Sequence, residues 1–183
     1  MERPMKIMII EEKNMTADID RDLKNALCRC FPADAEIFSQ SRAWHGSASA
    51  WSVIIEIEGC IAAHVGIVDR LIKAGDFQLQ AAGIQNVFVL PEYRGQGLGE
   101  KVMNAAMQEA EKRNFDVGLL YCVPQLEKLY AGCGWRLLPR QKIFRHDENG
   151  NIVPLPEKNI AMFFPLKVKS FPEGAIDLQG NDW

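Results

Sequence analysis

Three glycines at alternate positions stand directly before the clearest helical pattern of the chain. The stretch 87–99 reads VFVLPEYRGQGLG, so Arg94 precedes Gly95, Gly97 and Gly99. A backbone without Cβ atoms lets a ligand come close, and the first N–H groups of a helix have no acceptor within the helix. Together these features suit the binding of a phosphate or a pyrophosphate.

Spacing separates three explanations of these glycines. The dinucleotide fingerprint G-x-G-x-x-G needs a glycine where Glu100 stands, and it normally opens a domain, whereas Gly99 lies past the middle of the 183 residues. The P-loop pattern G-x-x-x-x-G-K-[ST] does not occur in the sequence. A tight turn between a strand and a helix, with no ligand, stays open as the third explanation.

Hydrophobic periodicity predicts the elements that must position this stretch. Apolar residues four apart behind Thr16, a capping residue, predict a first helix, and an amphipathic pattern predicts a second helix after the glycines. The expected helices cover 16–31, 98–113 and 124–131, and the expected strands cover 51–57, 60–73, 77–90, 116–121, 134–138 and 160–168. An antiparallel meander followed by strand, helix and strand predicts a mixed sheet with a parallel crossover. Residues 142–159 read as polar and turn-rich, and the tail from Ser170 reads as irregular.

Composition favours one domain over residues 1–183. The chain has 48% hydrophobic residues, 21 Lys and Arg against 24 Asp and Glu, and a formal net charge of −3. Because the basic residues are dispersed, we expect no nucleic-acid partner. The sequence contains no apolar run long enough for a membrane span, so we expect no membrane contact and a cytoplasmic location.

Cysteine and histidine positions do not predict a metal site. The five cysteines are an odd number without paired zinc spacing, and Cys28 and Cys30 alone could hold a metal only with further ligands. His45, His64 and His146 show no ligand spacing either. We therefore expect reduced thiols, ordinary histidines and no metal.

The stretch RGQGLG, at 94–99, resembles the R/Q-x-x-G-x-G/A motif of the GNAT superfamily of acyl-CoA-dependent N-acyltransferases. The strand before it, the long helix after it and the later sequence YCVPQLEKLYAGCGW agree with that family over residues 51–138. The resemblance implies an α/β (α+β) fold, a mixed, strongly twisted sheet with helices on both faces. It implies a cofactor-binding core over about 51–138 and an acceptor-side tail over about 139–183.

The resemblance also implies acetyl-CoA as cosubstrate and assigns residues to it. The cofactor-binding residues would be Val87, Phe88, Val89, Arg94, Gly95, Gln96, Gly97, Leu98, Gly99 and Leu126. The loop would hold the pyrophosphate, and the strand over 87–89 would pair with the pantetheine amides. The Val87 N–H would stabilise the oxyanion, and Tyr130 would protonate the departing thiolate. Periodicity alone favours a core aromatic residue at Tyr130, and the resemblance favours the general acid.

Two groups within the superfamily are similar to this chain, and both acylate the amine of an amino sugar. SRAWHG and AAHVGIVDRLIKAGD resemble the rhizobial nodulation N-acyltransferases; HVGIVDRLI, KLYAGCGW and GNDW resemble the aminoglycoside 2'-N-acetyltransferases. The second likeness implies that Asp182, Trp183 and Glu157 hold a cationic sugar. A frayed chain end is the alternative for the terminal pair.

The acceptor side departs from the aminoglycoside enzymes at two adjacent positions. Gln85 stands at the catalytic position where those enzymes have a glutamate base, and Asn86, a predicted substrate-binding residue, replaces a small residue. An amide cannot take up a proton, so another group or water must act as the base. Glu56 is a candidate, with a solvated strand residue as the alternative.

We therefore predict an N-acetyltransferase that moves an acetyl group from acetyl-CoA to a primary amine of an amino sugar or aminoglycoside-like molecule. The alternatives are a non-catalytic acyl-CoA sensor or interaction module of the same fold, and an acetyltransferase for a polyamine or a protein amine. By analogy with the superfamily, a homodimer is possible.

Overall fold

The computed structural model describes residues 4–138, 142–156 and 158–183. The described chain forms two units, each built from several segments because β3, β4 and α3 run through both. Unit 1 comprises Met1–Trp44, Ala48–Ile67 and Gln85–Ala106, and unit 2 comprises His45–Ser47, Val68–Ile84 and Met107–Trp183. The expected single domain over 1–183 stays a prediction.

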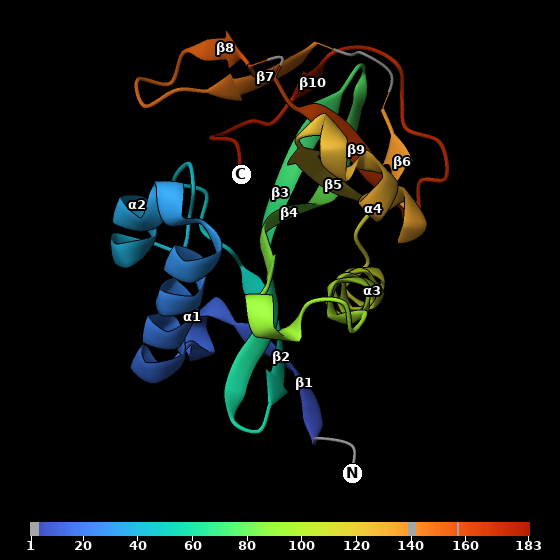
Figure 1. The fold of residues 1–183 in the computed structure, drawn as a ribbon. Coiled ribbons are helices and arrows are strands. Elements are labelled where there is room, and N and C mark those ends of the chain that lie inside the picture. The colour runs from blue at the N-terminus through green and yellow to red at the C-terminus, as the bar shows by residue number, and fades with distance from the viewer. Residues whose placement is uncertain (1–3, 139–141, 157) are drawn as a thin grey trace. The chain divides into compact units, whose positions relative to one another are not determined.

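The order of elements agrees with the mixed sheet expected from the sequence (Figure 1). The helices are α1 (Ala17–Cys30), α2 (Ala35–Gln40), α3 (Leu98–Lys112) and α4 (Glu127–Gly132). The strands are β1 (Met5–Glu11), β2 (Trp51–Ile57), β3 (Cys60–Ala74), β4 (Phe77–Val89), β5 (Val117–Cys122), β6 (Arg136–Leu137), β7 (Ile143–His146), β8 (Ile152–Pro154), β9 (Ile160–Pro165) and β10 (Ile176–Asp177). Short 3₁₀ turns are η1 (Glu12–Asn14), η2 (Pro32–Asp34), η3 (Pro91–Tyr93) and η4 (Pro124–Leu126).

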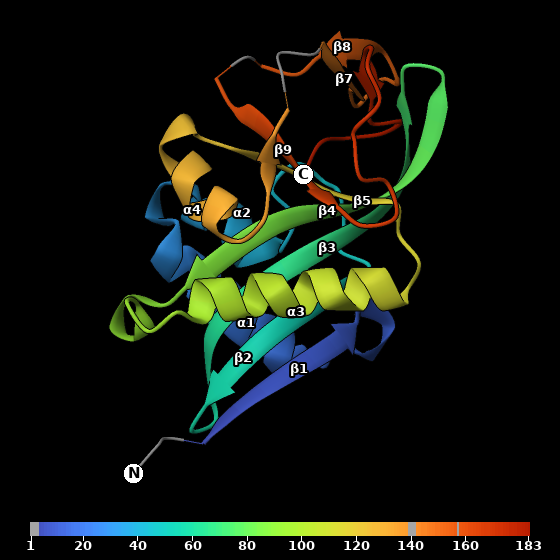
Figure 2. The same ribbon diagram turned by 90° about the vertical axis from the view of Figure 1, so that its right-hand side faces the viewer.

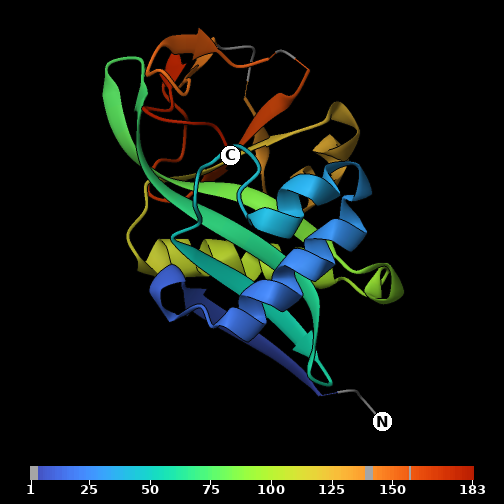
Figure 3. The ribbon, with the colours of Figure 1, turned by 90° about the vertical axis from the view of Figure 1, so that its left-hand side faces the viewer.

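In unit 1, helices cover both faces of a strand layer. β1 pairs antiparallel with β2, and β2 pairs antiparallel with β3 through the tight turn at Glu58 and Gly59. Figure 3 shows α1 in front of these strands, and Figure 2 shows the first residues of α3 on the opposite face. The Thr16 side chain accepts a hydrogen bond from the Ile19 N–H at 3.3 Å, as expected for a helix cap. The core beneath α1 contains Leu23, Leu27, Phe38, Ile54, Phe88 and Leu90.

In unit 2, the strand order is β6-β9-β5-β4-β3-β10-β7-β8. β4 and β5 pair in parallel from Ala81 to Ile84, so the segment between them is the crossover that the sequence predicts. β9 pairs antiparallel with both β5 and β6. β5 and β6, the strands before and after α4, therefore run parallel to each other with β9 between them. Leu79, Val117, Leu119, Phe163, Ile176, Leu178 and Trp183 are among the buried residues of its core.

The expectations for the C-terminal part were wrong at two places. The turn-rich stretch folds into the hairpin β7–β8, because Asp147 accepts hydrogen bonds from the backbone N–H groups of Asn149 and Asn151 and so closes the turn. The tail contains β10, which pairs with β3 and β7. The patterns also missed β1 and α2.

Candidate functional site

The glycine-rich stretch connects η3 to α3 through two left-handed residues. Gly95 has φ +74° and Gly97 has φ +73°, a region that residues with a side chain rarely adopt. A Cβ atom added at either position would meet no heavy atom within 4 Å. Packing therefore does not demand these glycines; the backbone conformation does, and the space next to them is open.

The first turn of α3 is directed at this open space. The Lys101 N–H donates to the Gly97 carbonyl at 3.1 Å, so Gly97 is the N-cap residue. The N–H groups of residues 98–100 precede the first intrahelical bond and have no acceptor within the helix. Gly99 differs from the other two glycines, because its Cβ would lie 3.7 Å from Val89 Cγ2, an ordinary contact distance. Two of the three glycines thus form a cradle that an anionic group would fit.

Contacts with α1 and β4 hold the loop in place. Arg29 Nη2 lies 2.9 and 3.0 Å from the two carboxylate oxygens of Glu92 in η3. Arg94 Nε donates to the Val89 carbonyl at 3.1 Å, and its side chain is otherwise exposed. The Cys30 thiol lies 3.9 Å from the same carbonyl, and burial raises the pKa of this thiol. The predicted pyrophosphate residues therefore adjoin the end of the predicted pantetheine strand.

The last five residues of β4 begin with an irregularity. The pairing of β4 with β5 ends at Ile84, whereas β4 continues to Val89. Asn86 adopts φ +54°, which a short amide side chain tolerates and which interrupts the regular strand. The buried Gln85 side chain donates from Nε2 to Ser49 Oγ at 3.1 Å, so its amide acts as a donor and not as a base.

Two groups bind Asn86 from different sides. Its Nδ2 donates to the Arg42 carbonyl, and its own carbonyl lies 2.9 Å from His64 Nδ1. The Arg42 side chain is fixed in turn, because it forms ion pairs with Asp20 at 2.6 Å and with Glu12 at 2.5 Å. The position of the irregularity is therefore set by surrounding contacts.

Tyr130 lies on α4 in unit 2 and is only 7% exposed. Its ring meets Trp135 edge to face, with centroids 6.4 Å apart. Burial raises the pKa of Tyr130, and the neighbouring thiols of Cys122 and Cys133 raise it further. The hydroxyl is therefore protonated at neutral pH, as a proton donor must be. Leu126, the other predicted cofactor residue of this region, is 38% exposed in η4.

The C-terminal residue packs into unit 2 and is not frayed. Trp183 is 7% exposed; its ring covers Gly83, where a Cβ would collide with it, and it lies 5.8 Å from the Tyr121 ring. Its indole N–H donates to the Leu119 carbonyl at 3.4 Å. The Arg70 guanidinium lies 5.7 Å from the indole centroid and donates to backbone carbonyls of residues 178 and 181.

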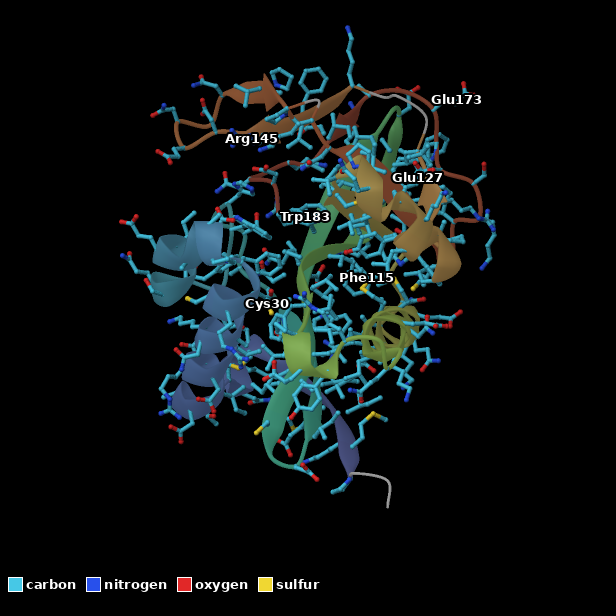
Figure 4. All side chains as sticks on the ribbon, viewed as in Figure 1. Cys30, Phe115, Glu127, Arg145, Glu173 and Trp183 are labelled. Carbon is cyan, nitrogen blue, oxygen red and sulfur yellow. The ribbon has the colours of Figure 1, made fainter. Side chains whose placement is uncertain are left out.

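Asp182 is the buried acidic group of this tail. Its carboxylate lies 3.5 Å from Arg145 Nη1 and 4.0 Å from His45 Nε2, and Figure 4 shows Arg145 and Trp183 in this part of unit 2. Within the described residues, the buried Tyr121 hydroxyl has no hydrogen-bond partner, and Asp182 Oδ1 has only the ion pair with Arg145. Burial raises the pKa of Tyr121, and the Asp182 charge adds to this effect.

The predicted site residues thus fall into two groups. Unit 1 holds those of β4 and the glycine-rich loop; unit 2 holds Leu126, Tyr130, Asp182 and Trp183. Glu157 lies outside the described residues. Glu56 is half-buried on β2 directly opposite Lys6, an arrangement typical of a cross-strand charge pair.

Sequence reasoning missed three buried polar residues near Gln85 and Asn86. His64 bonds to the Asn86 carbonyl, Ser52 to His64 and Ser49 to Gln85, and His64 was expected to be an ordinary histidine. A histidine within an apolar strand pattern was the available signal, but the sequence does not show what it contacts. In the part of the chain that the structure covers, no cluster of His, Cys, Asp or Glu could hold a metal ion. The described helices include none with the length and apolar character needed to cross a membrane.

Comparison with known proteins agrees with these observations. The model of the acetyltransferase (GNAT) family matches residues 21–135, more than half of the chain. An aminoglycoside 2'-N-acetyltransferase of Mycolicibacterium fortuitum is 24% identical over 148 residues, which cover 81% of this chain and 74% of that protein.

Two solved structures show the same fold. A GNAT-family N-acetyltransferase from Escherichia coli, solved in complex with CoA, has a TM-score of 0.67 at 15% identity, covering 97% of this chain and 92% of that one. An acyl-CoA N-acyltransferase from Pseudomonas aeruginosa has a TM-score of 0.63 at 17% identity, covering 88% of this chain and 99% of that one. The expected fold is confirmed, and the chain belongs to the GNAT family of N-acetyltransferases, enzymes that use acetyl-CoA.

Proposed function

We propose that this enzyme transfers the acetyl group of acetyl-CoA to a primary amine of an amino sugar or an aminoglycoside-like molecule. The observation that carries the cofactor half is the open cradle at Gly95 and Gly97 before α3. A diphosphate there would accept hydrogen bonds from the first N–H groups of the helix, and the exposed Arg94 would supply positive charge. Any side chain at these two positions would occupy that space.

The end of β4 would bind the rest of the cosubstrate. β4 continues beyond its pairing with β5, and the residues concerned are Val87, Phe88 and Val89. Backbone groups of such a strand can pair with the amides of pantetheine, as an added strand pairs with a sheet edge. We assign to the Val87 N–H the stabilisation of negative charge on the thioester oxygen during attack by the amine.

Proton transfer would involve Tyr130 and water. Because burial keeps Tyr130 protonated, its hydroxyl can donate a proton to the CoA thiolate as the C–S bond breaks. Gln85 cannot accept the proton that the attacking ammonium must first lose. We therefore assign this deprotonation to a water molecule that the Gln85 amide and its neighbours orient.

The tail supports an acceptor that carries positive charge and hydroxyl groups. Among the described residues of unit 2, the Tyr121 hydroxyl has no hydrogen-bond partner, and Asp182 Oδ1 has only the 3.5 Å ion pair with Arg145. An ammonium group could donate to the carboxylate, and a sugar hydroxyl could bond to the tyrosine. Arg145 already offsets part of the Asp182 charge, so the site favours an amino sugar over a highly charged polyamine. The aminoglycoside enzyme with 24% identity points to the same class of acceptor.

The test is an acceptor panel. The protein is incubated with acetyl-CoA and, separately, with aminoglycosides, glucosamine oligomers, polyamines and peptide N-termini, and a thiol reagent measures the free CoA released. We expect release that depends on an amino sugar or aminoglycoside. Selective release with a polyamine or a peptide would overturn the acceptor class and leave acetyl transfer intact. Release that no amine increases would overturn the proposed reaction.

A further inference from the structure

The Asn86–Val87 peptide lies at the point where β4 departs from regular geometry. Asn86 has φ +54° and is 3% exposed, and its side chain is bound to the Arg42 carbonyl. A left-handed residue within a strand redirects the next peptide group away from the regular ladder. The left-handed Asn86 therefore contributes to the direction of the Val87 N–H.

His64 makes a hydrogen bond to this same peptide. Its Nδ1 lies 2.9 Å from the Asn86 carbonyl oxygen, and its Nε2 lies 3.1 Å from Ser52 Oγ. A carbonyl can only accept, so Nδ1 carries the proton and Nε2 accepts from the Ser52 hydroxyl. The ring is 1% exposed and stacks on Phe88 with centroids 5.4 Å apart, which fixes its orientation.

The burial of His64 keeps this arrangement in one protonation state. Removal from water, with a smaller contribution from the nearby Arg42 charge, lowers the pKa of His64 to about 4, although the bond to Asn86 opposes the shift. The imidazole is therefore neutral at physiological pH, with its single proton on Nδ1.

Amide geometry transmits this contact to Val87. The carbonyl of Asn86 and the N–H of Val87 belong to one planar peptide unit, and no described peptide bond is cis. In a trans peptide the C=O and N–H bonds point in opposite directions. A donor that fixes the carbonyl therefore fixes the N–H on the other side, and it also polarises the amide so that the N–H becomes a stronger donor.

We propose that His64 is a positioning residue that orients and polarises the Val87 N–H for its role at the thioester oxygen, with Ser52 holding the required tautomer. This inference rests on the proposed function, because it assigns a purpose to the Val87 amide. His64 itself does not touch the reacting atoms. Two hydrogen bonds connect the Ser52 hydroxyl to the His64 imidazole and the imidazole to the Asn86–Val87 peptide.

Two substitutions at His64 separate positioning from packing. In His64→Asn the amide nitrogen can take the place of Nδ1 and donate to Asn86. In His64→Gln it reaches the place of Nε2, and the Asn86 carbonyl loses its donor. Both variants remove the ring and its stacking on Phe88, so we expect similar losses of melting temperature in the two.

The first measurement is the ¹H–¹⁵N resonance of Val87 in the free protein, which needs no substrate. We expect His64→Asn to keep this resonance near its wild-type position and His64→Gln to move it to lower ¹H and ¹⁵N shifts. The second measurement is kinetic. We expect His64→Gln to lower kcat about tenfold with an unchanged KM for acetyl-CoA, and His64→Asn to restore most of the loss.

Equal effects of the two variants on the Val87 resonance and on kcat would overturn the proposal, whether both are large or both absent. If His64→Gln fails to fold, His64→Leu replaces it, because leucine is apolar and leaves the Asn86 carbonyl without a donor. An unmoved Val87 resonance in His64→Leu would then overturn the proposal. If no amine is acetylated by the wild type, the proposed function fails, while the Val87 resonance still decides whether His64 orients this peptide.

Discussion

The buried histidine predicts a specific dependence of stability on pH. The pKa of His64 falls from an ordinary value of 6.5 to about 4 in the folded protein, mainly because burial disfavours the charged ring. As the pH falls below 6.5, the unfolded chain therefore binds a proton that the folded chain does not. The contribution of His64 to the free energy of unfolding is full above pH 6.5, decreases down to about pH 4 and then levels off. The complete loss corresponds to about 3 kcal/mol, of which about 2 kcal/mol is lost by about pH 5.

Urea unfolding followed by tryptophan fluorescence measures this loss when wild type and His64→Asn are compared. The variant has no imidazole at this site but keeps His45, His146 and all carboxyl groups, so their contributions cancel in the difference. We expect the stability advantage of the wild type over His64→Asn to shrink by about 2 kcal/mol between about pH 7 and about pH 5.

An advantage that stays constant over this pH range would refute the reasoning. So would an NMR titration in which the His64 ring ionises near 6.5, because the folded and unfolded pKa values would then be equal. Either result would mean that the hydrogen bonds to Asn86 and Ser52 do not hold a neutral ring in solution.

Three further predictions concern the reaction. Tyr130→Phe is expected to lower kcat by about one to two orders of magnitude with the calorimetric Kd for acetyl-CoA intact, and unchanged turnover would remove Tyr130 from the mechanism. Gly97→Trp is expected to abolish acetyl-CoA binding in calorimetry. Gly150→Trp, with the same left-handed backbone and open surroundings in the β7–β8 turn, should keep it; native affinity of the Gly97 variant would contradict the loop assignment. Asp182→Asn should raise the KM of an amino-sugar acceptor about tenfold and leave the KM of acetyl-CoA unchanged. An acceptor KM equal to that of the wild type would contradict the assignment of Asp182 to acceptor binding.

Elements with strong periodic patterns could be predicted from the sequence. α1 and α3 show apolar residues at helical spacing, and the strands β2 and β3 are rich in β-branched residues. The two strands of the β7–β8 hairpin are too short for alternation to be visible, although the side-chain bonds of Asp147 that close their turn are local. β10 has two residues and forms only because β3 and β7 lie beside it.

The residues of the candidate site also differ in whether the local sequence could predict them. The glycines at 95 and 97 could be assigned from spacing because their requirement is local: a left-handed backbone before a helix. The left-handed Asn86 could not, since its conformation depends on Arg42 and His64, both distant in sequence. The packing of Trp183 against Gly83 likewise joins residues that no local pattern connects.

The most direct test of the central claim is the stoichiometry of acetyl transfer. Acetyl-CoA and the best acceptor of the panel are incubated with wild type and with Gly97→Trp, and free CoA and acetylated amine are quantified in the same sample. We predict one acetylated amine for each CoA released by the wild type, and neither product above background with the variant. Release of CoA without acetylated amine, or full transfer by Gly97→Trp, would contradict the account.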